Sequence, residues 1–174
     1  MSGSINSRKH ASKIVRRVRS DDVNAISEIY NFYVMETAVT FEEKAVTSDD
    51  IQSRIHDVES SDLPWLVGEE KGRIIGYAYA NRWKERSAYR HSVEVSVYVD
   101  HTLHKKGWGT VLYRALFDEL RNRDIHLAIG GITLPNEASI ALHEKFGMEK
   151  VAHFRGIGYK FGEWRDVGYW QKNL

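Results

Sequence analysis

The chain lacks cysteine altogether, and this absence excludes several kinds of chemistry. With zero cysteines in 174 residues, it can form neither disulfides nor cysteine zinc sites, and it has no thiol nucleophile. The formal net charge is only +1, so nothing in the overall charge favours nucleic acid or an anionic membrane. No segment approaches the roughly 18 consecutive apolar residues of a membrane-spanning helix, and no apolar signal core stands at the start. We therefore expect a cytoplasmic protein.

Length and composition favour one domain. A chain of 174 residues with 42% hydrophobic residues can bury a sizeable core. Residues 1–12 are polar and rich in serine, which predicts a disordered lead-in. No internal repeat and no linker interrupts the rest, so we expect residues 13–174 to form a single α/β domain.

The most informative stretch changes its hydrophobic period near its middle. Val93, Val95, Val97 and Val99 alternate with polar or aromatic residues, which is typical of a strand. From Trp108 the apolar residues follow one helical stripe, made of Trp108, Val111, Leu112, Ala115, Leu116 and Leu120. The segment between them contains two glycines. A glycine-rich turn before a helix leaves backbone N–H groups unpaired at the positive end of the helix dipole, so it predicts a pyrophosphate site. The predicted cradle consists of Lys105, Lys106, Gly107, Trp108, Gly109 and Thr110.

Two familiar phosphate-binding motifs do not fit this loop. A P-loop needs GxxxxGK[ST], which the chain does not contain. A dinucleotide fingerprint needs a third glycine where Leu112 stands. The loop matches a third pattern, [QR]xxGx[GA], except that His104 occupies the first position.

The remaining segments predict further strands and helices around this stretch. Lys13 to Arg19 is either a first strand with solvated basic residues or a basic arm for nucleic acid. Ser20-Asp21-Asp22 caps a helix, Glu36 to Thr47 is a surface loop, and Ser48 caps a second helix. Trp65–Val67 and Arg73–Ala80 are predicted to form a hairpin, and a further strand is predicted from Ile125 to its end at Gly130-Gly131. Pro135 opens a predicted helix. Two β-runs follow, Lys150–Arg155 and Asp166–Gln171, and Gly156, Gly158 and Gly162 break the region between them.

The ordered set of segments resembles a known family. It is similar to the GNAT superfamily of N-acetyltransferases, in its phosphinothricin and methionine sulfone branch, from about Ile14 onward. The resemblance implies a mixed, mostly antiparallel twisted sheet with helices on both faces. It also implies acetyl-CoA as cofactor, bound in a splay between the Val93–Val99 and Ile125–Ile132 strands. The segments that carry it are Ile29-Tyr30-Asn31, Pro64 to Val67, Trp83 to Arg86, Glu94 to Val99, the loop before the Trp108 helix, Leu134-Pro135-Asn136, Leu142-His143-Glu144 and Gly158 to Gly168.

The resemblance also assigns cofactor contacts. It implies that the backbone of Val97, Tyr98 and Val99 pairs with the pantetheine arm like an added strand, and that Lys105 through Thr110 hold the pyrophosphate. Asn136 matches an asparagine that family members place on the cofactor's arm. The alternative for Asn136 is a plain helix N-cap.

Two residues are candidates for proton transfer. An α-ammonium must lose a proton before its nitrogen can attack a thioester, so the site needs a base. Glu94 matches the proposed base of the branch, with a simple surface carboxylate as the alternative. His143 stands where many relatives carry a tyrosine acid, with a surface histidine as the alternative. Because the chain has no cysteine, we expect transfer in one ternary complex.

The resemblance implies an acceptor site that binds a small amino acid. Arg86 is expected to bind the α-carboxylate in bidentate fashion, although the arginines of this loop could also be ordinary solvated side chains. The branch usually forms homodimers, and Lys160 lies in the tail that in this branch reaches the partner subunit's site. The aromatic residues of this tail could form either that interface or core. The predicted acceptor residues are Phe41, Trp83, Lys84, Glu85, Arg86, Tyr89, Glu94, Val95, Ser96 and Lys160.

Three other interpretations remain open at this stage. A metal enzyme is disfavoured, because His91, Asp100, His101 and His104 come without an HExxH motif or cysteines, and we expect no metal. A non-catalytic acyl-CoA-binding module is a second class. A third keeps the enzyme but changes the acceptor to a polyamine, an aminoglycoside or a peptide N-terminus, which a carboxylate clamp at Arg86 would disfavour.

Overall fold

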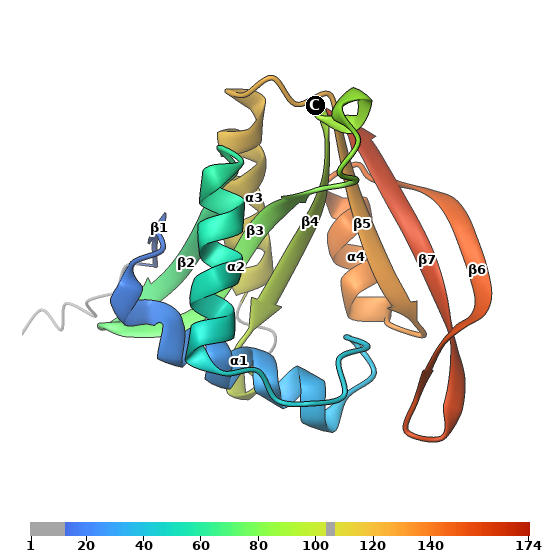
Figure 1. Ribbon diagram of the computed structural model, residues 1–174, viewed down its shortest axis with the longest axis horizontal. Coiled ribbons are helices and arrows are strands. Elements are labelled where there is room, and N and C mark those ends of the chain that lie inside the picture. The colour runs from blue at the N-terminus through green and yellow to red at the C-terminus, as the bar shows by residue number, and fades with distance from the viewer. Residues whose placement is uncertain (1–12, 104–106) are drawn as a thin grey trace, which may run out of the picture.

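A single sheet organises the protein. The computed structural model describes residues 13–103 and 107–174, and within them seven strands form one sheet in the order β1-β2-β3-β4-β5-β7-β6 (Figure 1). Neighbouring strands are antiparallel except β4 and β5, which confirms the predicted mixed sheet. The strands are β1 (Ile14–Arg17), β2 (Trp65–Glu70), β3 (Arg73–Arg82), β4 (Ser92–Val99), β5 (Leu127–Leu134), β6 (Glu149–Lys160) and β7 (Glu163–Asn173).

Helices cover both faces of the sheet, as predicted. Figure 1 shows α1 and α2 on one face and α3 and α4 on the other. None of the helices within the described residues is long and apolar enough to cross a membrane. The predicted lead-in 1–12 and the predicted cradle lysines Lys105 and Lys106 lie outside the described residues. The helices are α1 (Val23–Glu36), α2 (Ser48–Ser60), α3 (Trp108–Arg121) and α4 (Glu137–Lys145).

Helix α3 packs against the middle of the sheet along the predicted stripe. Trp108, Leu112 and Leu116 are fully buried there. Two strand glycines allow this close approach: a Cβ atom at Gly68 would lie 2.8 Å from the Trp108 ring, and one at Gly76 would lie 3.2 Å from Leu112. Burial of this stripe anchors the glycine loop that precedes the helix.

Three predicted boundaries were wrong. Helix α2 is capped by Thr47, whose side chain accepts from Asp50 N, rather than by Ser48. Strand β5 continues through both glycines instead of ending there. Glycine serves packing at these positions, because a Cβ at Gly130 would collide with the buried His143 ring and one at Gly131 would crowd Glu94. Strands β6 and β7 extend beyond the predicted runs, because an irregular register between Phe154 and Gly158 absorbs the glycines without ending the ladder.

Strands β4 and β5 separate after a short contact. Their parallel pairing joins Ser92 to Leu127, Val93 to Ala128 and Glu94 to Ile129. Beyond Glu94 the two strands diverge toward α1 (Figure 1), and no strand within the described residues pairs with that edge of β4. This is the predicted splay, and it leaves backbone groups of β4 available to a ligand.

Candidate active site

A cavity of about 350 Å³ opens where the glycine loop meets α3 and α4. Gly107 has a φ of 74° and is the N-cap of α3, a backbone conformation that favours glycine. No side chain of the described residues caps this helix, so its first N–H groups stay available to an anion. These features fit a pyrophosphate. The cavity is lined by Val99, Leu103, Gly107, Trp108, Gly109, Thr110, Ala138, Ala141, Leu142 and Lys145.

The second glycine of the motif, Gly109, lies in the first turn of α3 and close to α4. A Cβ at Gly109 would lie 3.2 Å from the Leu142 side chain of α4, so a larger residue would crowd that side chain. Trp108, predicted as part of the cradle, is only 1% exposed and anchors the loop in the core. Its predicted role at the cofactor can therefore involve its backbone but little of its side chain.

Helix α4 contributes one residue that the sequence reasoning missed. Lys145 lines the same cavity, and its Nζ lies 3.3 Å from Thr110 Oγ1. A lysine in the last turn of a helix normally interacts with the helix dipole, so the sequence carried no signal for this role. The predicted Asn136 is the N-cap of α4, and its side chain accepts from Ser139 N at 3.1 Å. Its contact with the cofactor's arm stays a prediction.

Glu94 faces a second cavity, of about 310 Å³, on the α1 side of the sheet. It occupies the last paired position of β4 and β5, the point from which the strands diverge. Burial raises the pKa of its carboxyl, and the positive charge of Lys84 partly opposes that shift. The predicted Phe41, Ser96 and Glu94 come together here. The lining residues are Val39, Thr40, Phe41, Glu94, Ser96, Tyr98, Gly131, Thr133, Ile157, Val167 and Tyr169.

The sheet brings two unpredicted residues, Tyr169 and Gly131, next to Glu94. Gly131 of β5 pairs with Tyr169 of β7, and a Cβ at Gly131 would lie 3.2 Å from both Glu94 Oε1 and the Tyr169 ring. Burial raises the pKa of Tyr169, and the charge of Glu94 adds to that effect. Nothing in the local sequence indicates these neighbours, because they come from two other strands: Gly131 lies 37 positions and Tyr169 lies 75 positions further along the chain than Glu94.

The predicted residues of the 83–91 loop line two further cavities. Trp83, Lys84 and Tyr89 border an apolar one of about 460 Å³, which shares Ile157 and Tyr169 with the Glu94 cavity. Glu85 and Arg86 line another of about 410 Å³, together with Lys84 and Tyr89. Trp83 packs edge-on against Tyr169 at 5.6 Å between ring centroids. Arg86 therefore borders a cavity that shares Lys84 and Tyr89 with the apolar one, and it does not border the Glu94 cavity itself.

His143 is buried between α4, α3 and β5, so the surface alternative for it is wrong. It is 3% exposed, and burial lowers its pKa, which favours a neutral ring. Its Nδ1 lies 2.7 Å from Ser139 O and its Nε2 lies 3.0 Å from the Tyr113 hydroxyl. Because a carbonyl only accepts, Nδ1 carries the proton, and Nε2 accepts from Tyr113. Both nitrogens are thus engaged, and the role of His143 as an acid stays a prediction.

Two predicted acceptor residues lie away from the cavities. Val95 is 3% exposed and belongs to the hydrophobic core, since it alternates with Glu94 along β4 and faces the other side of the sheet. Lys160 is 2% exposed at the end of β6. Its Nζ donates to the carbonyl oxygens of Val34 and Thr40, at 2.7 Å each.

Comparisons with known proteins agree with this geometry. The Acetyltransferase (GNAT) domain family matches residues 15–168. The chain is 37% identical over 162 residues to the phosphinothricin N-acetyltransferase of Streptomyces viridochromogenes, covering 92% of this chain and 87% of that protein. It is 36% identical over 160 residues to the L-methionine sulfoximine/L-methionine sulfone acetyltransferase of Salmonella typhimurium, covering 92% and 94%. The structure of YncA from Salmonella typhimurium with its cofactor acetyl-CoA has a TM-score of 0.90 and 35% identity, covering 93% of this chain and 94% of that one.

The matches to known proteins and the geometry of the site point to the same family. The diverging β4 and β5 strands and the uncapped N-terminus of α3 form one side of the site. A half-buried carboxylate, Glu94, lies on the other side of the sheet. The matched residues span all of these elements. The chain therefore belongs to the GNAT acetyltransferase family and is an acetyl-CoA-dependent N-acetyltransferase.

Proposed function

We propose that the enzyme acetylates the α-amino group of a small amino-acid-like acceptor of the phosphinothricin, methionine sulfone or methionine sulfoximine type. The observation that carries the proposal is the position of Glu94, a half-buried carboxylate at the point where β4 and β5 diverge, facing a cavity of about 310 Å³. A cavity of this size suits a small molecule. The phosphinothricin and methionine sulfoximine/sulfone acetyltransferases described above support the same acceptor class.

Glu94 acts as the base in this proposal. The acceptor's α-ammonium loses a proton to the carboxylate, directly or through one water, and the free amine then becomes the nucleophile. The raised pKa of Glu94 makes it a better proton acceptor than an ordinary surface carboxylate. Acetyl-CoA supplies the activated thioester when it is bound.

Backbone groups and basic residues position the two substrates. The free edge of β4 at Val97, Tyr98 and Val99 pairs with the pantetheine arm, and an N–H of this segment stabilises the developing oxyanion. The N-terminus of α3 and Lys145 hold the pyrophosphate end. The coenzyme A thiol is already fairly acidic and leaves readily as a thiolate. The proposed acid, His143, therefore contributes less to the reaction rate than Glu94.

Arg86 defines the acceptor class in this proposal. A guanidinium binds a carboxylate with two parallel hydrogen bonds, which a polyamine cannot offer. Tyr89 lines the Arg86 cavity and, together with Trp83, also the neighbouring apolar cavity, which suits the uncharged part of an amino-acid side chain. A free amino acid therefore matches these cavities better than a polycation does.

We also propose that the enzyme is a homodimer, and its location in the cytoplasm stays a prediction. Large apolar side chains are exposed along the β6–β7 hairpin, with Ile157 56%, Phe161 57% and Trp164 70% exposed. Exposed apolar side chains of this size favour association with a second copy. We expect a wild-type dimer in size-exclusion chromatography with light scattering, and a shift toward monomer in Trp164→Glu. A monomeric wild type at micromolar concentration would contradict the dimer.

The acceptor class is tested by measuring thiol release from acetyl-CoA with a small panel. The panel contains L-phosphinothricin, L-methionine sulfone, L-methionine sulfoximine, spermidine and a short peptide. We expect turnover with the three amino acids alone. Turnover with spermidine or the peptide would keep the fold and the base but overturn the acceptor proposal. No turnover on all five, with acetyl-CoA still bound, would favour a non-catalytic acyl-CoA-binding protein.

A further inference from the structure

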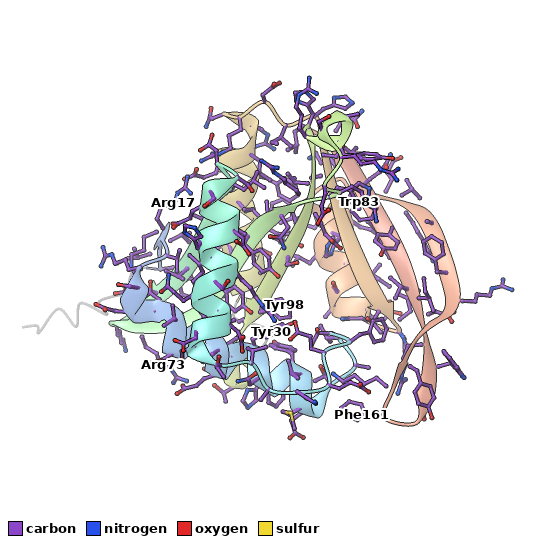
Figure 2. All side chains as sticks on the ribbon, viewed as in Figure 1. Arg17, Tyr30, Arg73, Trp83, Tyr98 and Phe161 are labelled. Atoms are coloured by element: carbon purple, nitrogen blue, oxygen red, sulfur yellow. The ribbon has the colours of Figure 1, made fainter. Side chains whose placement is uncertain are left out.

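Lys160 is a buried lysine that the proposed chemistry does not use. It lies at the end of β6, next to the hairpin tip where Figure 2 shows Phe161, and it is 2% exposed. Its Nζ donates to Val34 O, in the last turn of α1, and to Thr40 O, in the 37–47 loop, both at 2.7 Å. No carboxylate within the described residues forms an ion pair with it.

A buried ammonium group that donates its hydrogen bonds to two neutral carbonyl oxygens is unusual. Lysine is almost never fully buried unless it is paired, because removing its charge from water is costly. Burial lowers the pKa of Lys160, and the charges of Glu42 and Glu43 only partly oppose this. The two carbonyls belong to different segments, the last turn of α1 and the 37–47 loop. The contact therefore links three parts of the fold: the end of α1, the 37–47 loop and the β6–β7 hairpin.

The 37–47 loop forms one wall of the Glu94 cavity. Val39, Thr40 and Phe41 all line that cavity, whereas Lys160 does not. The loop touches β6 a second time at Gly158, two residues before Lys160, where any Cβ atom would collide with the Phe41 ring. Strand β6 thus holds adjacent loop residues by a hydrogen bond to the backbone of Thr40 and by packing against the side chain of Phe41.

The opposite side of the same loop is fixed by helices α1 and α2. The Tyr30 hydroxyl lies 2.9 Å from Thr40 Oγ1 and 2.8 Å from Glu42 Oε1. Arg54 of α2 binds both carboxylate oxygens of Glu42, at 2.8 and 3.0 Å. Thr40 is therefore held from both sides, by Tyr30 through its side chain and by Lys160 through its carbonyl.

From this arrangement we propose that Lys160 is a positioning residue, which holds the 37–47 loop in the conformation that shapes the Glu94 cavity without itself contacting the acceptor. The inference rests on the proposed function, since it takes this cavity as the acceptor site. We therefore expect that a change at Lys160, next to the hairpin tip, alters acceptor binding but does not alter acetyl-CoA binding.

The test compares Lys160→Met with Lys172→Met. Lys172 is a matched control, because its Nζ also donates to a carbonyl at a helix end, Phe146 O at 2.6 Å, but far from the 37–47 loop. Hydrogen–deuterium exchange of the 37–47 amides is measured first, followed by kinetics. We expect Lys160→Met to speed exchange in this loop at least about 10-fold and to raise the acceptor KM about 10-fold. The acetyl-CoA KM should stay unchanged, and Lys172→Met should change neither loop exchange nor acceptor KM.

Three outcomes would overturn the inference. The first is unchanged loop exchange in Lys160→Met. The second is an equal increase of the acceptor and acetyl-CoA KM values, and the third is the same pattern in Lys172→Met; either of these would indicate a general structural role. Exchange is measured without any substrate, so its result stands even if the acceptor proposal fails. Should Lys160→Met not fold, Gly158→Ala tests the same loop by displacing Phe41, with the same expected and contradicting results.

Discussion

The two halves of the proposed active site, one for acetyl-CoA and one for the acceptor, are built in different ways. The acetyl-CoA half consists mainly of one continuous segment, the end of β4, the glycine loop and the start of α3, completed by α4. The acceptor half is assembled from the 37–47 loop, β4, β5, β6 and β7. The contact from Lys160 to Thr40 alone spans 120 positions. A local segment forms the first half, and long-range pairing forms the second.

The difference follows from what each half must recognise. Phosphate and an extended thiol arm can be bound by backbone N–H and C=O groups, which any sequence offers once the turn and helix are correct. A small amino acid is recognised by side chains that converge from several directions. The cofactor half should therefore depend on backbone geometry, and the acceptor half on individual side chains. Four substitutions test this comparison.

The largest effect is expected for Gly107→Glu. The carboxylate would repel the pyrophosphate, and the positive φ of 74° disfavours any side chain. Acetyl-CoA binding in calorimetry should weaken at least about 1000-fold, roughly 4 kcal/mol. Gly72→Glu is the matched control, since Gly72 has a φ of 77° in an open turn between β2 and β3. Unchanged acetyl-CoA affinity in Gly107→Glu would refute the cradle.

Glu94→Gln should lower kcat about 100-fold while leaving acetyl-CoA affinity intact. Because the pKa of Glu94 is raised above 4.5, wild-type activity should fall as the pH drops through that raised pKa, where the base becomes protonated. Wild-type turnover by the mutant from pH 6 to 9 would remove Glu94 from the mechanism.

The Glu94 carboxyl should affect stability in the opposite direction: a higher pH favours its activity as a base but lowers the stability of the fold. A raised pKa in the folded state means that the fold prefers the protonated form, so this stabilising contribution is present at low pH and is lost as the pH rises through the folded pKa. Glu94→Gln has no charge to bury and should melt about 2 °C higher than wild type at pH 8. The difference should vanish near pH 4. A mutant that melts lower at pH 8 would contradict the burial argument.

Arg86→Met should raise the acceptor KM about 10- to 100-fold, the usual range for losing hydrogen bonds to a charged group. The acetyl-CoA KM should not change. Arg90→Met is the control from the same loop, since Arg90 borders a different cavity, with Arg82 and Arg123. Equal effects of the two mutants would show that the loop acts by general charge and not by a specific clamp.

The smallest effect is expected for Lys145→Gln. Lys145 is a solvent-exposed cation at the rim of the acetyl-CoA cavity, so its attraction for phosphate is screened by water and salt. The acetyl-CoA KM should rise about 3-fold, and the rise should shrink in 0.5 M salt. Lys150→Gln, on exposed β6, should have no effect. A loss comparable with Gly107→Glu would mean that side chains, and not the backbone, hold the cofactor.

The sequence predicted well the strand and the helix of the proposed acetyl-CoA half, because their signals are local. The period of two before Val99 and the helical stripe from Trp108 correctly predicted a strand and a helix on either side of the glycine loop. It could not reveal that β5 continues through Gly130, because that depends on the His143 ring packed against it. For the same reason, the burial of His143 and its contact with Tyr113 were not predictable from a lone helical histidine.

The sequence by itself determined the elements, the glycine loop and the resemblance that led to the GNAT family, because periodicity, turn chemistry and motif order depend on neighbouring residues. Only the tertiary structure decided the surroundings of Glu94. It raised the pKa of that carboxyl by burial, brought Tyr169 beside it, and buried Lys160 against Val34 and Thr40. These features need strand pairing between distant segments, and no local pattern encodes which distant segment will pair.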